Sequence, residues 1–476
     1  MENLKDINNI ENVFNENKKP FGLKDKVGYL MGELGNSFVF MFVAMYLMIF
    51  YTKVWGVSTS LVGVLFLIAR FIDAFSDITM GTIVDKSKPG KDGKFRIWIK
   101  RMSAPLTLMT FLMFQSGLAN ASMTVKIVVM FATYILWGSI CYTSVNIPYG
   151  SMASAITENP AERASLSTWR SLGSSLTGII IGSIAPQIIY YADANGNQLI
   201  NPQNFTMVAG VFSLISFMCY MGCYKLTTER VKFEVKDDAQ RVSIFKSFKN
   251  LIKNRALIGL LIVSMILLLS MLLSQTMNQY LFADYFKDIK ALSLLNLVGL
   301  PVTLALASVI TKLAAKYGKK EISIAGMIFA GLMYLVMFFL KIENSILYIV
   351  LYTLAVLGTN ALNMLIWAII TDVIDYNEVI TGQRDDGAIY GVYSFSRKIG
   401  QALAGGVGGF ALTLIGYDSL VAVQATSVTN GIYTISTIFP AICFILIALV
   451  LFFVYPLDKK TVEVNSNKLS EMRKNK

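Results

Sequence analysis

The chain has 476 residues, of which 55% are hydrophobic and 15% are charged, and its mean hydropathy of +0.57 excludes an ordinary soluble globular protein. The formal net charge is +12, and the sequence contains no histidine. Zinc sites built from histidine, serine–histidine–aspartate catalysis and histidine proton relays are therefore excluded.

Apolar stretches of about 20 residues, long enough to cross roughly 30 Å of hydrocarbon, recur along the whole sequence. They predict an all-α integral membrane protein with twelve transmembrane helices. The expected spans are 27–50, 58–84, 97–119, 124–149, 166–190, 205–225, 256–285, 291–315, 321–341, 344–374, 388–416 and 431–455.

Basic residues gather in alternate loops between these spans. Loops 191–204 and 417–430 carry almost none, whereas the basic segments are 86–101, 225–255, 312–320 and 459–476. Under the positive-inside rule this alternation predicts that both termini are cytoplasmic. The net positive charge then reflects membrane topology, and no nucleic-acid partner is expected.

The longest polar stretch between spans divides the chain into two halves. We expect a cytoplasmic N-terminal tail (1–24) without a signal peptide, since it has no apolar core. The remaining parts are a six-helix bundle (25–225), a cytoplasmic central loop (226–255), a second six-helix bundle (256–456) and a cytoplasmic tail (457–476). Two parallel repeats with a site between them are the plan of secondary transporters.

The second span carries charges where a membrane helix should have none. Asp73 and Asp77 lie one turn apart on one face, and Arg70 flanks Asp73. Each charge costs on the order of 2.5–3.5 kcal/mol on insertion scales, so the group needs partners or water. An Arg70–Asp73 pair that only locks helices would leave Asp77 unpaired. A proton, or sodium with its preference for hard oxygen ligands, would suit both carboxylates.

The loop after this span reads "GTIVDKSKPGKDGK" and contains Asp85, Gly93 and Lys94. It resembles the G-x-x-x-D-x-x-x-G-[RK] loop of the major facilitator superfamily. An acid at a helix end beside a basic loop can latch neighbouring helices while they rock.

The fourth and fifth spans are joined by "NIPYGSMASAITENPAERASLSTWR". Asn146 and Pro148 are expected to end the fourth span. Trp169 and Arg170 lie early in the fifth, where an aromatic ring and a guanidinium would suit a polar sugar. An interfacial tryptophan–arginine anchor is the alternative.

Other polar side chains within the spans could bind a sugar or hold helices together. Amides suit sugar hydroxyls because they both donate and accept hydrogen bonds. These candidates are Glu33 and Asn36 in span one, Asn146 in span four, Gln275 and Asn278 in span seven, and Asn363 and Trp367 in span ten. In span eleven, Lys398 either approaches the aspartates, where it could replace a cation, or reaches the cytoplasmic surface beside Arg397.

Several stretches together resemble the glycoside–pentoside–hexuronide:cation symporter family of the major facilitator superfamily, over about residues 27–456. They are "RFIDAFSDITMGTIVD", "YILWGSICYTSVNIPYGS", "ERASLSTWRSLG", "TDVIDYNEVITGQR" and "SRKIGQALAGG". The resemblance implies that Asp73 and Asp77 bind the cation, that Lys398 belongs to the same charge cluster and that Arg170 contacts the sugar.

The chain departs from the melibiose permease pattern within that family. Asn36 and Ser37 replace a Lys-Asp pair, and Asn146 and Gly150 replace a sugar-binding aspartate and tryptophan. The sequence is more similar to the xyloside and glucuronide carriers. Unless Glu33 reaches across, Arg170 then has few carboxylate partners. An unpaired guanidinium would favour a uronic acid over a neutral glycoside.

We therefore expect a multi-pass bacterial inner-membrane symporter, acting as a monomer among lipids, that imports a glycoside, pentoside or hexuronide with Na⁺ or H⁺ and needs no cofactor. Two alternatives share the fold: an uncoupled sugar facilitator or exchanger, and a lysolipid carrier. An enzyme or ATP-driven pump is not expected, since the sequence has no G-x-x-x-x-G-K-[ST] loop, no H-E-x-x-H motif and no large soluble domain.

Overall fold

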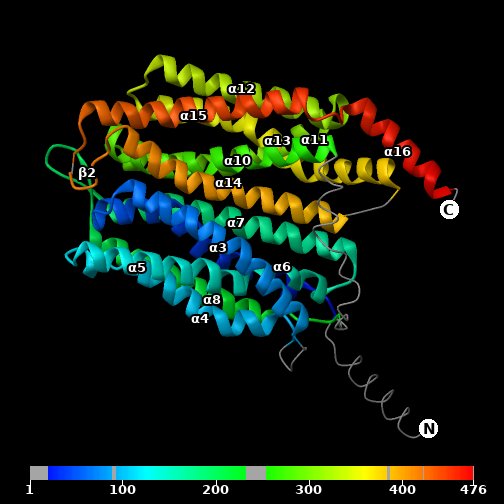
Figure 1. The fold of residues 1–476 in the computed structure, drawn as a ribbon, viewed down its shortest axis with the longest axis horizontal. Coiled ribbons are helices and arrows are strands. Elements are labelled where there is room, and N and C mark those ends of the chain that lie inside the picture. Colours follow the sequence, from blue (N-terminus) through cyan, green and yellow to red (C-terminus); the bar gives the residue numbers. More distant parts are fainter. Residues whose placement is uncertain (1–19, 88–92, 232–253, 383–385, 422, 475–476) are drawn as a thin grey trace, which may run out of the picture.

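The computed structural model describes residues 20–87, 93–231, 254–382, 386–421 and 423–474, which are largely helical (Figure 1). The first group of helices is α2 (Leu23–Ile49), α3 (Thr59–Lys86), α4 (Arg96–Met113), α5 (Met123–Ile135), α6 (Thr143–Ile156), α7 (Pro160–Ile189) and α8 (Pro202–Leu226). The second group is α10 (Arg255–Tyr280), α11 (Ile289–Tyr317), α12 (Lys319–Leu340), α13 (Ser345–Thr381), α14 (Asp386–Leu414), α15 (Thr426–Phe453) and α16 (Lys459–Lys474).

Three π-helical segments extend or join these helices. They are η1 (Phe50–Val54) after α2, η3 (Leu136–Tyr142) between α5 and α6, and η5 (Leu281–Tyr285) after α10; a 3₁₀ turn, η2 (Ser116–Leu118), precedes α5. A π turn rotates the following helix and frees backbone groups, and it often marks a functional site.

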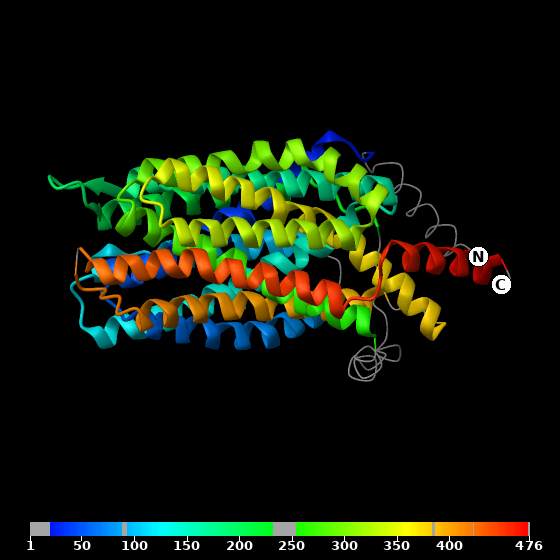
Figure 2. The same ribbon diagram turned by 90° about the horizontal axis from the view of Figure 1, so that it is seen from above.

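The helices form two groups that lie side by side in Figure 1, and the C-terminal group lies in front of the N-terminal one in Figure 2. Helices α2 to α8 pack against one another and form the N-terminal half; α10 to α15 likewise form the C-terminal half. The halves meet along α3 and α14, α7 and α11, and α2 and α10. A substrate path between the halves would therefore be lined by these six helices.

Eight helices of the described ranges are long and apolar enough to span a membrane. They coincide with predicted spans one, four, five, six, seven, nine, ten and twelve. The other four predicted spans coincide with α3, α4, α11 and α14. The count of twelve spans and the cytoplasmic termini stay predictions.

The two ends of the bundle differ in their connections. At one end β1 (Tyr190–Ala192) pairs antiparallel with β2 (Gln198–Ile200), a hairpin that the sequence analysis did not predict. The side-chain and backbone N–H groups of Asn197, with the N–H of Asn195, hold the pKa of Asp193 below its usual range. We call this the hairpin end; α16 lies at the opposite end (Figure 1).

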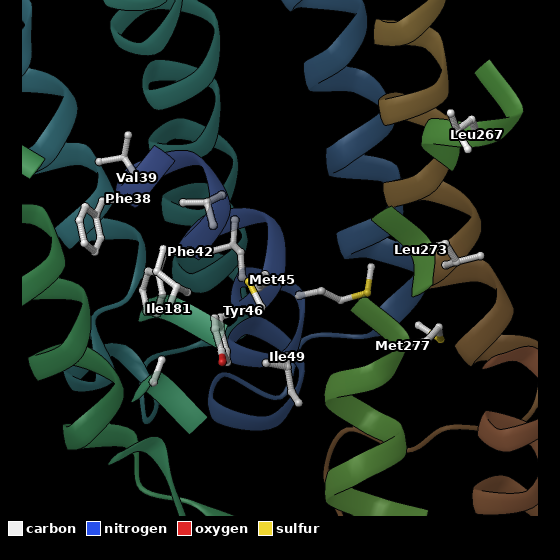
Figure 3. Close-up of a cluster of buried hydrophobic side chains, with 14 of the residues drawn as sticks. Phe38, Val39, Phe42, Met45, Tyr46, Ile49, Ile181, Leu267, Leu273 and Met277 are labelled. Atoms are coloured by element: carbon white, nitrogen blue, oxygen red, sulfur yellow. The ribbon is translucent and has the colours of Figure 1, made fainter. Parts of the chain in front are cut away.

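Helix α2 lies at the centre of the packing. Its Phe42 and Tyr46 are fully buried, and Figure 3 shows them in a cluster of apolar side chains between the helices. In the same view Met45 and Ile49 lie on the side of α2 that faces Leu273 and Met277 of α10. Burial of such side chains, roughly 25 cal/mol per Å² where the alternative is water, is weaker inside lipid, so close packing carries more of the stability there.

Close packing of the halves at the hairpin end depends on glycine. A Cβ on Gly63 of α3 would stand 3.1 Å from the carbonyl oxygen of Gly406 in α14, and one on Gly409 would stand 2.4 Å from that of Thr59. Side chains at these positions would push α3 and α14 apart.

One predicted boundary is wrong. Asn146 and Pro148 do not end the fourth span, because α6 continues through Pro148 to Ile156. A proline is tolerated there because other groups can satisfy the carbonyl that it leaves free.

Candidate functional site

Two carboxylates and an arginine project from the middle of α3. Arg70 Nη1 donates to Asp73 Oδ2 at 3.2 Å, an i, i+3 pair within one helix. This pair is the structural arrangement that sequence reasoning anticipated as an alternative to cation binding. It leaves Asp77 to find another partner.

The neighbouring α5–η3–α6 span supplies a hydroxyl to each carboxylate. Ser139 Oγ donates to Asp73 Oδ1 at 2.5 Å, and Thr143 Oγ1 donates to Asp77 Oδ1 at 2.8 Å. Ser139 lies in η3, and Thr143 is the first residue after η3. The π segment therefore sets the spacing of the two hydroxyls. A Cβ on Gly138 would stand 3.4 Å from Asp73 Oδ1, an ordinary van der Waals distance, so this part of η3 lies directly beside the carboxylate.

The remaining oxygen of Asp77 is bound from the opposite half. Lys398 of α14 forms an ion pair with Asp77 Oδ2. Its neighbour Arg397 turns elsewhere and lies 5.9 Å from the ring centres of Trp367 and Tyr393. Of the two positions foreseen for Lys398, the structure has the one beside the aspartates, and the charges of Arg70, Asp73, Asp77 and Lys398 sum to zero.

A cavity of about 50 Å³ lies next to this cluster, between the two halves. Aromatic and polar side chains from both halves line it. They include Phe40, Phe66, Arg70, Tyr134 and Trp137 from the N-terminal half and Thr276 and Gln401 from the C-terminal half.

Arg170 forms a second charged group in the N-terminal half. Its Nε donates to Glu33 Oε2 at 2.8 Å, and its guanidinium lies 5.2 Å from the ring centre of Tyr149. Glu33 therefore does reach across from α2, and the premise of an unpaired Arg170 is wrong. The arginine side chain is still 39% exposed. The aromatic ring beneath it belongs to Tyr149 rather than to the predicted Trp169.

Polar contacts of α2 reach the residue that adjoins Thr143. Asn36 Nδ2 donates to Tyr142 Oη at 3.1 Å, and Tyr220 Oη donates to Asn36 Oδ1 at 3.4 Å. Tyr142 is followed directly by Thr143, which binds Asp77. Two adjacent residues thus contact the polar groups of α2 and the carboxylate of α3.

The other predicted polar residues are spread over both halves. Asn146 and Trp169 are half-buried in the N-terminal half. Gln275 is half-buried on α10, while Asn278 is buried and contacts Tyr352. On α13, Asn363 Nδ2 lies 3.7 Å from the sulfur of Met271, and Trp367 packs edge-on against Tyr393 at 5.7 Å.

The predicted latch after α3 is organised by a residue that sequence reasoning missed. Glu229 accepts the backbone N–H groups of Lys94, Phe95 and Arg96 at 2.7–2.9 Å, at the start of α4. Gly93 has φ +94°, and a Cβ there would stand 2.6 Å from Glu229 Cδ. A carboxylate at a helix N-terminus is favourable. The Asp85 side chain lies outside the described part.

Comparisons with known proteins now identify the family. The family described as "MFS/sugar transport protein" matches residues 28–459. The chain belongs to this family. It is a transporter of the major facilitator superfamily and not an enzyme, as its motifs predicted.

The relatives of this transporter are bacterial. It is 32% identical over 444 residues to the "Glucuronide carrier protein homolog" of Escherichia coli (strain K12), covering 92% of this chain and 93% of the relative. It is 30% identical over 447 residues to the "Uncharacterized symporter YjmB" of Bacillus subtilis (strain 168), covering 93% and 94%. With its membrane-spanning helices, these relatives indicate a multi-pass protein of a bacterial inner membrane.

Solved structures share the fold at low sequence identity. The inward-open xylose transporter XylE from E. coli superposes with a TM-score of 0.62 at 11% sequence identity, covering 93% of this chain and 97% of that one. This similarity confirms the major facilitator fold expected from the sequence.

Sequence reasoning missed Ser139, Thr143, Tyr134, Trp137 and Glu229. Ser139 and Thr143 were within the quoted stretch "YILWGSICYTSVNIPYGS", but hydroxyls are common in membrane helices and their direction depends on η3. The cavity-lining aromatic residues are no different in sequence from aromatic residues that fill a core.

Proposed function

We propose that this transporter imports an acidic sugar together with Na⁺ or H⁺ by alternating access. The observation that carries the proposal is the charge cluster of α3. Asp73 and Asp77 each meet a hydroxyl of the α5–η3–α6 span, and Asp77 also meets a lysine from the opposite half.

The cation would bind at Asp73 and Asp77. Two carboxylates with the hydroxyl oxygens of Ser139 and Thr143 offer the hard oxygen ligands that sodium prefers. The same carboxylates could instead take up a proton. Because Lys398 holds Asp77, a cation must displace that lysine, which frees one contact between the halves.

The relation between Lys398 and the cation gives a route for coupling. Lys398 belongs to α14 and Asp77 to α3, so exchange of lysine for cation changes an interaction across the interface. A ligand shifts a conformational equilibrium only through its different interaction with the two states. The exchange provides such a difference.

The sugar would bind beside the cluster, between the halves. Arg170, Asn36 and Tyr142 supply a guanidinium, an amide and a hydroxyl, and Trp137 borders the adjoining cavity. An acidic group would pair with the exposed part of the Arg170 guanidinium. Similarity to a glucuronide carrier homolog supports an acidic sugar, and similarity to a symporter supports ion coupling.

Tyr142 and Thr143 would link the two sites. The first contacts Asn36 on the sugar side, and the second binds Asp77 on the cation side. A cation that draws Thr143 into its ligand set would also fix Tyr142. The two substrates would then favour each other's binding, because a coupling free energy acts equally in both directions.

Uptake into lipid vesicles that contain the purified protein tests the proposal. We expect 4-nitrophenyl glucuronide to accumulate above the external concentration when an inward sodium or proton gradient is imposed. The responsive gradient identifies the cation. Uptake that only equilibrates, whatever gradient is applied, would establish an uncoupled facilitator instead.

A further inference from the structure

A second ion pair joins the two halves at the hairpin end. Lys53 Nζ of η1 lies 2.5 Å from Asp284 Oδ1 of η5, and the two side chains are only 11% and 5% exposed. Thr52, which directly precedes Lys53, and Tyr280, one turn before Asp284, are hydrogen-bonded through Oγ1 and Oη at 3.0 Å. The ends of α2 and α10 are thus tied together by charge and hydrogen bonding.

Other contacts between the halves gather at the same end. Thr413 of α14 bonds the hydroxyls of Thr59 and Ser60 of α3 at 2.7 and 2.8 Å. Lys287 Nζ donates to Asn197 Oδ1 of the hairpin at 2.6 Å, and Asn296 Nδ2 donates to the carbonyl of Gly182 at 3.0 Å. The structure is therefore closed at the hairpin end.

Polar side chains around the ion pair are buried and poorly hydrogen-bonded. Among the described residues, several polar atoms near the pair have no hydrogen-bond partner within 3.5 Å: Tyr46 Oη, Tyr190 Oη, Asp284 Oδ2, Tyr417 Oη, Gln279 Oε1 and Gln279 Nε2. They come from both halves. Tyr417 faces Asp284 and Tyr46 faces Gln279 in long, weak polar contacts, while Tyr190 lies near Asp284 without such a contact.

Burial of such groups raises the free energy of the closed interface, and this cost is removed when the interface opens. A buried polar group without a partner loses its hydration and gains nothing in exchange. Separation of the halves at this end would expose the same groups to water or to the hydroxyls of a sugar. It would also leave Lys53 on the N-terminal half without the carboxylate that neutralises it.

We propose that Lys53 and Asp284 form a charge lock that closes the hairpin end, and that the groups around them form a vestibule in which Lys53 binds the acidic group of an entering sugar. The carboxylate of Asp284 marks the position that the substrate's acidic group takes. This inference rests on the proposed function for the identity of the ligand, while the lock itself does not.

Two variants separate the lock from the binding site. Lys53→Gln and Asp284→Asn both break the ion pair, but only Lys53→Gln removes the cation that meets the substrate. The exchange Lys53→Asp with Asp284→Lys restores a pair of opposite charges. These three variants are compared with the parent, each with and without Thr59→Cys, a buried position in the seal.

The lock is measured by maleimide labelling of the Thr59→Cys thiol in lipid nanodiscs. The native cysteines are buried, and the protein without Thr59→Cys gives their background. We expect severalfold faster labelling in both single variants and parental labelling in the charge exchange, which also shows that the protein still folds. Unchanged labelling in the single variants overturns the lock.

The vestibule is measured by the half-saturating concentrations for uptake of 4-nitrophenyl glucuronide and 4-nitrophenyl glucoside. For the glucuronide this concentration should rise about tenfold in Lys53→Gln relative to Asp284→Asn, because a hydrogen bond to a charged group is lost. The glucoside should not distinguish the two variants. An equal change for both compounds overturns the assignment of Lys53.

The two proposals fail in different ways. A parent protein that takes up neither compound contradicts the proposed function and, with it, the acidic-sugar vestibule. The labelling result still decides the lock, because it needs no transport.

Discussion

The interface between the halves contains two ion pairs of different character. Asp77 and Lys398 meet in the middle of the bundle, with side chains 19% and 36% exposed and a hydroxyl on the carboxylate. Lys53 and Asp284 meet at the hairpin end, with side chains 11% and 5% exposed. The first pair lies beside a cavity, where the proposed mechanism has a cation replace the lysine, whereas the second is sealed inside the closed interface.

The difference follows from what surrounds each pair. The central carboxylates are bonded to the hydroxyls of Ser139 and Thr143 and have a cavity beside them, so in the proposed mechanism a cation would take the place of Lys398. Buried tyrosines surround Asp284, so another cation could reach its carboxylate only if the halves separated. We therefore expect the central pair to respond to the driving ion and the hairpin-end pair to respond to conformation.

The largest effect is expected from removal of the central carboxylates. Asp73→Asn and Asp77→Asn should each abolish gradient-driven accumulation, because an amide cannot take up a proton or neutralise sodium. Uptake is measured in vesicles with an imposed gradient. Asp458→Asn, which alters a carboxylate that caps α16 by accepting the N–H of Thr461, serves as the control. If both variants still concentrate the substrate, the cation site lies elsewhere.

Selectivity should change next most strongly at Arg170. Arg170→Gln should raise the half-saturating glucuronide concentration by about tenfold or more, since hydrogen bonds to a charged group contribute about 1.5–3 kcal/mol. The neutral glucoside should be much less affected. Arg163→Gln alters an arginine of the same helix that bonds the carbonyl of Glu158. Equal losses for both sugars would show that Arg170 acts only through its structural pair with Glu33.

Lys398→Gln tests the exchange of lysine for cation directly. Without the lysine, the half-saturating concentration of the driving cation should fall by about tenfold, because a charge beside a carboxylate alters its cation affinity on that scale. Arg397→Gln, which alters the adjacent arginine near Trp367, should leave it unchanged. A higher cation requirement in Lys398→Gln would mean that the lysine assists binding.

The smallest effect is expected within a single half. Gly93→Ala places a Cβ against Glu229 at φ +94°, which should lower the free energy of unfolding by about 1–3 kcal/mol. Thermal unfolding in detergent measures this change, and Gly117→Ala, with open space around the new Cβ, is the control. The cation dependence of uptake should stay as in the parent. A shift in that dependence would place the α3–α4 turn in the coupling mechanism.

Sequence patterns predicted most of the helices but not their internal irregularities. Apolar runs and alternating loop charges are local properties, so the spans and the division into halves follow from them. The hairpin at 190–200 and the passage of α6 through Pro148 were not expected. A short strand pair and a proline tolerated by its surroundings depend on neighbours that the local sequence does not specify.

The candidate site divides in the same way. Asp73, Asp77 and Arg70 are conspicuous because a charge inside an apolar run needs a reason, and the motifs around them indicated the family. The partners were less predictable. Whether Lys398 reached Asp77 or the membrane surface, and whether Glu33 reached Arg170, depended on how helices distant in sequence pack.

The sequence alone thus determined that this is a polytopic membrane protein of the major facilitator superfamily with charges inside its second span, because hydrophobicity and charge are carried by each residue. Only the tertiary structure decided which charges neutralise one another. Asp77 meets Lys398 and Lys53 meets Asp284 across the interface, and pairs separated by hundreds of residues form only when the two halves come together.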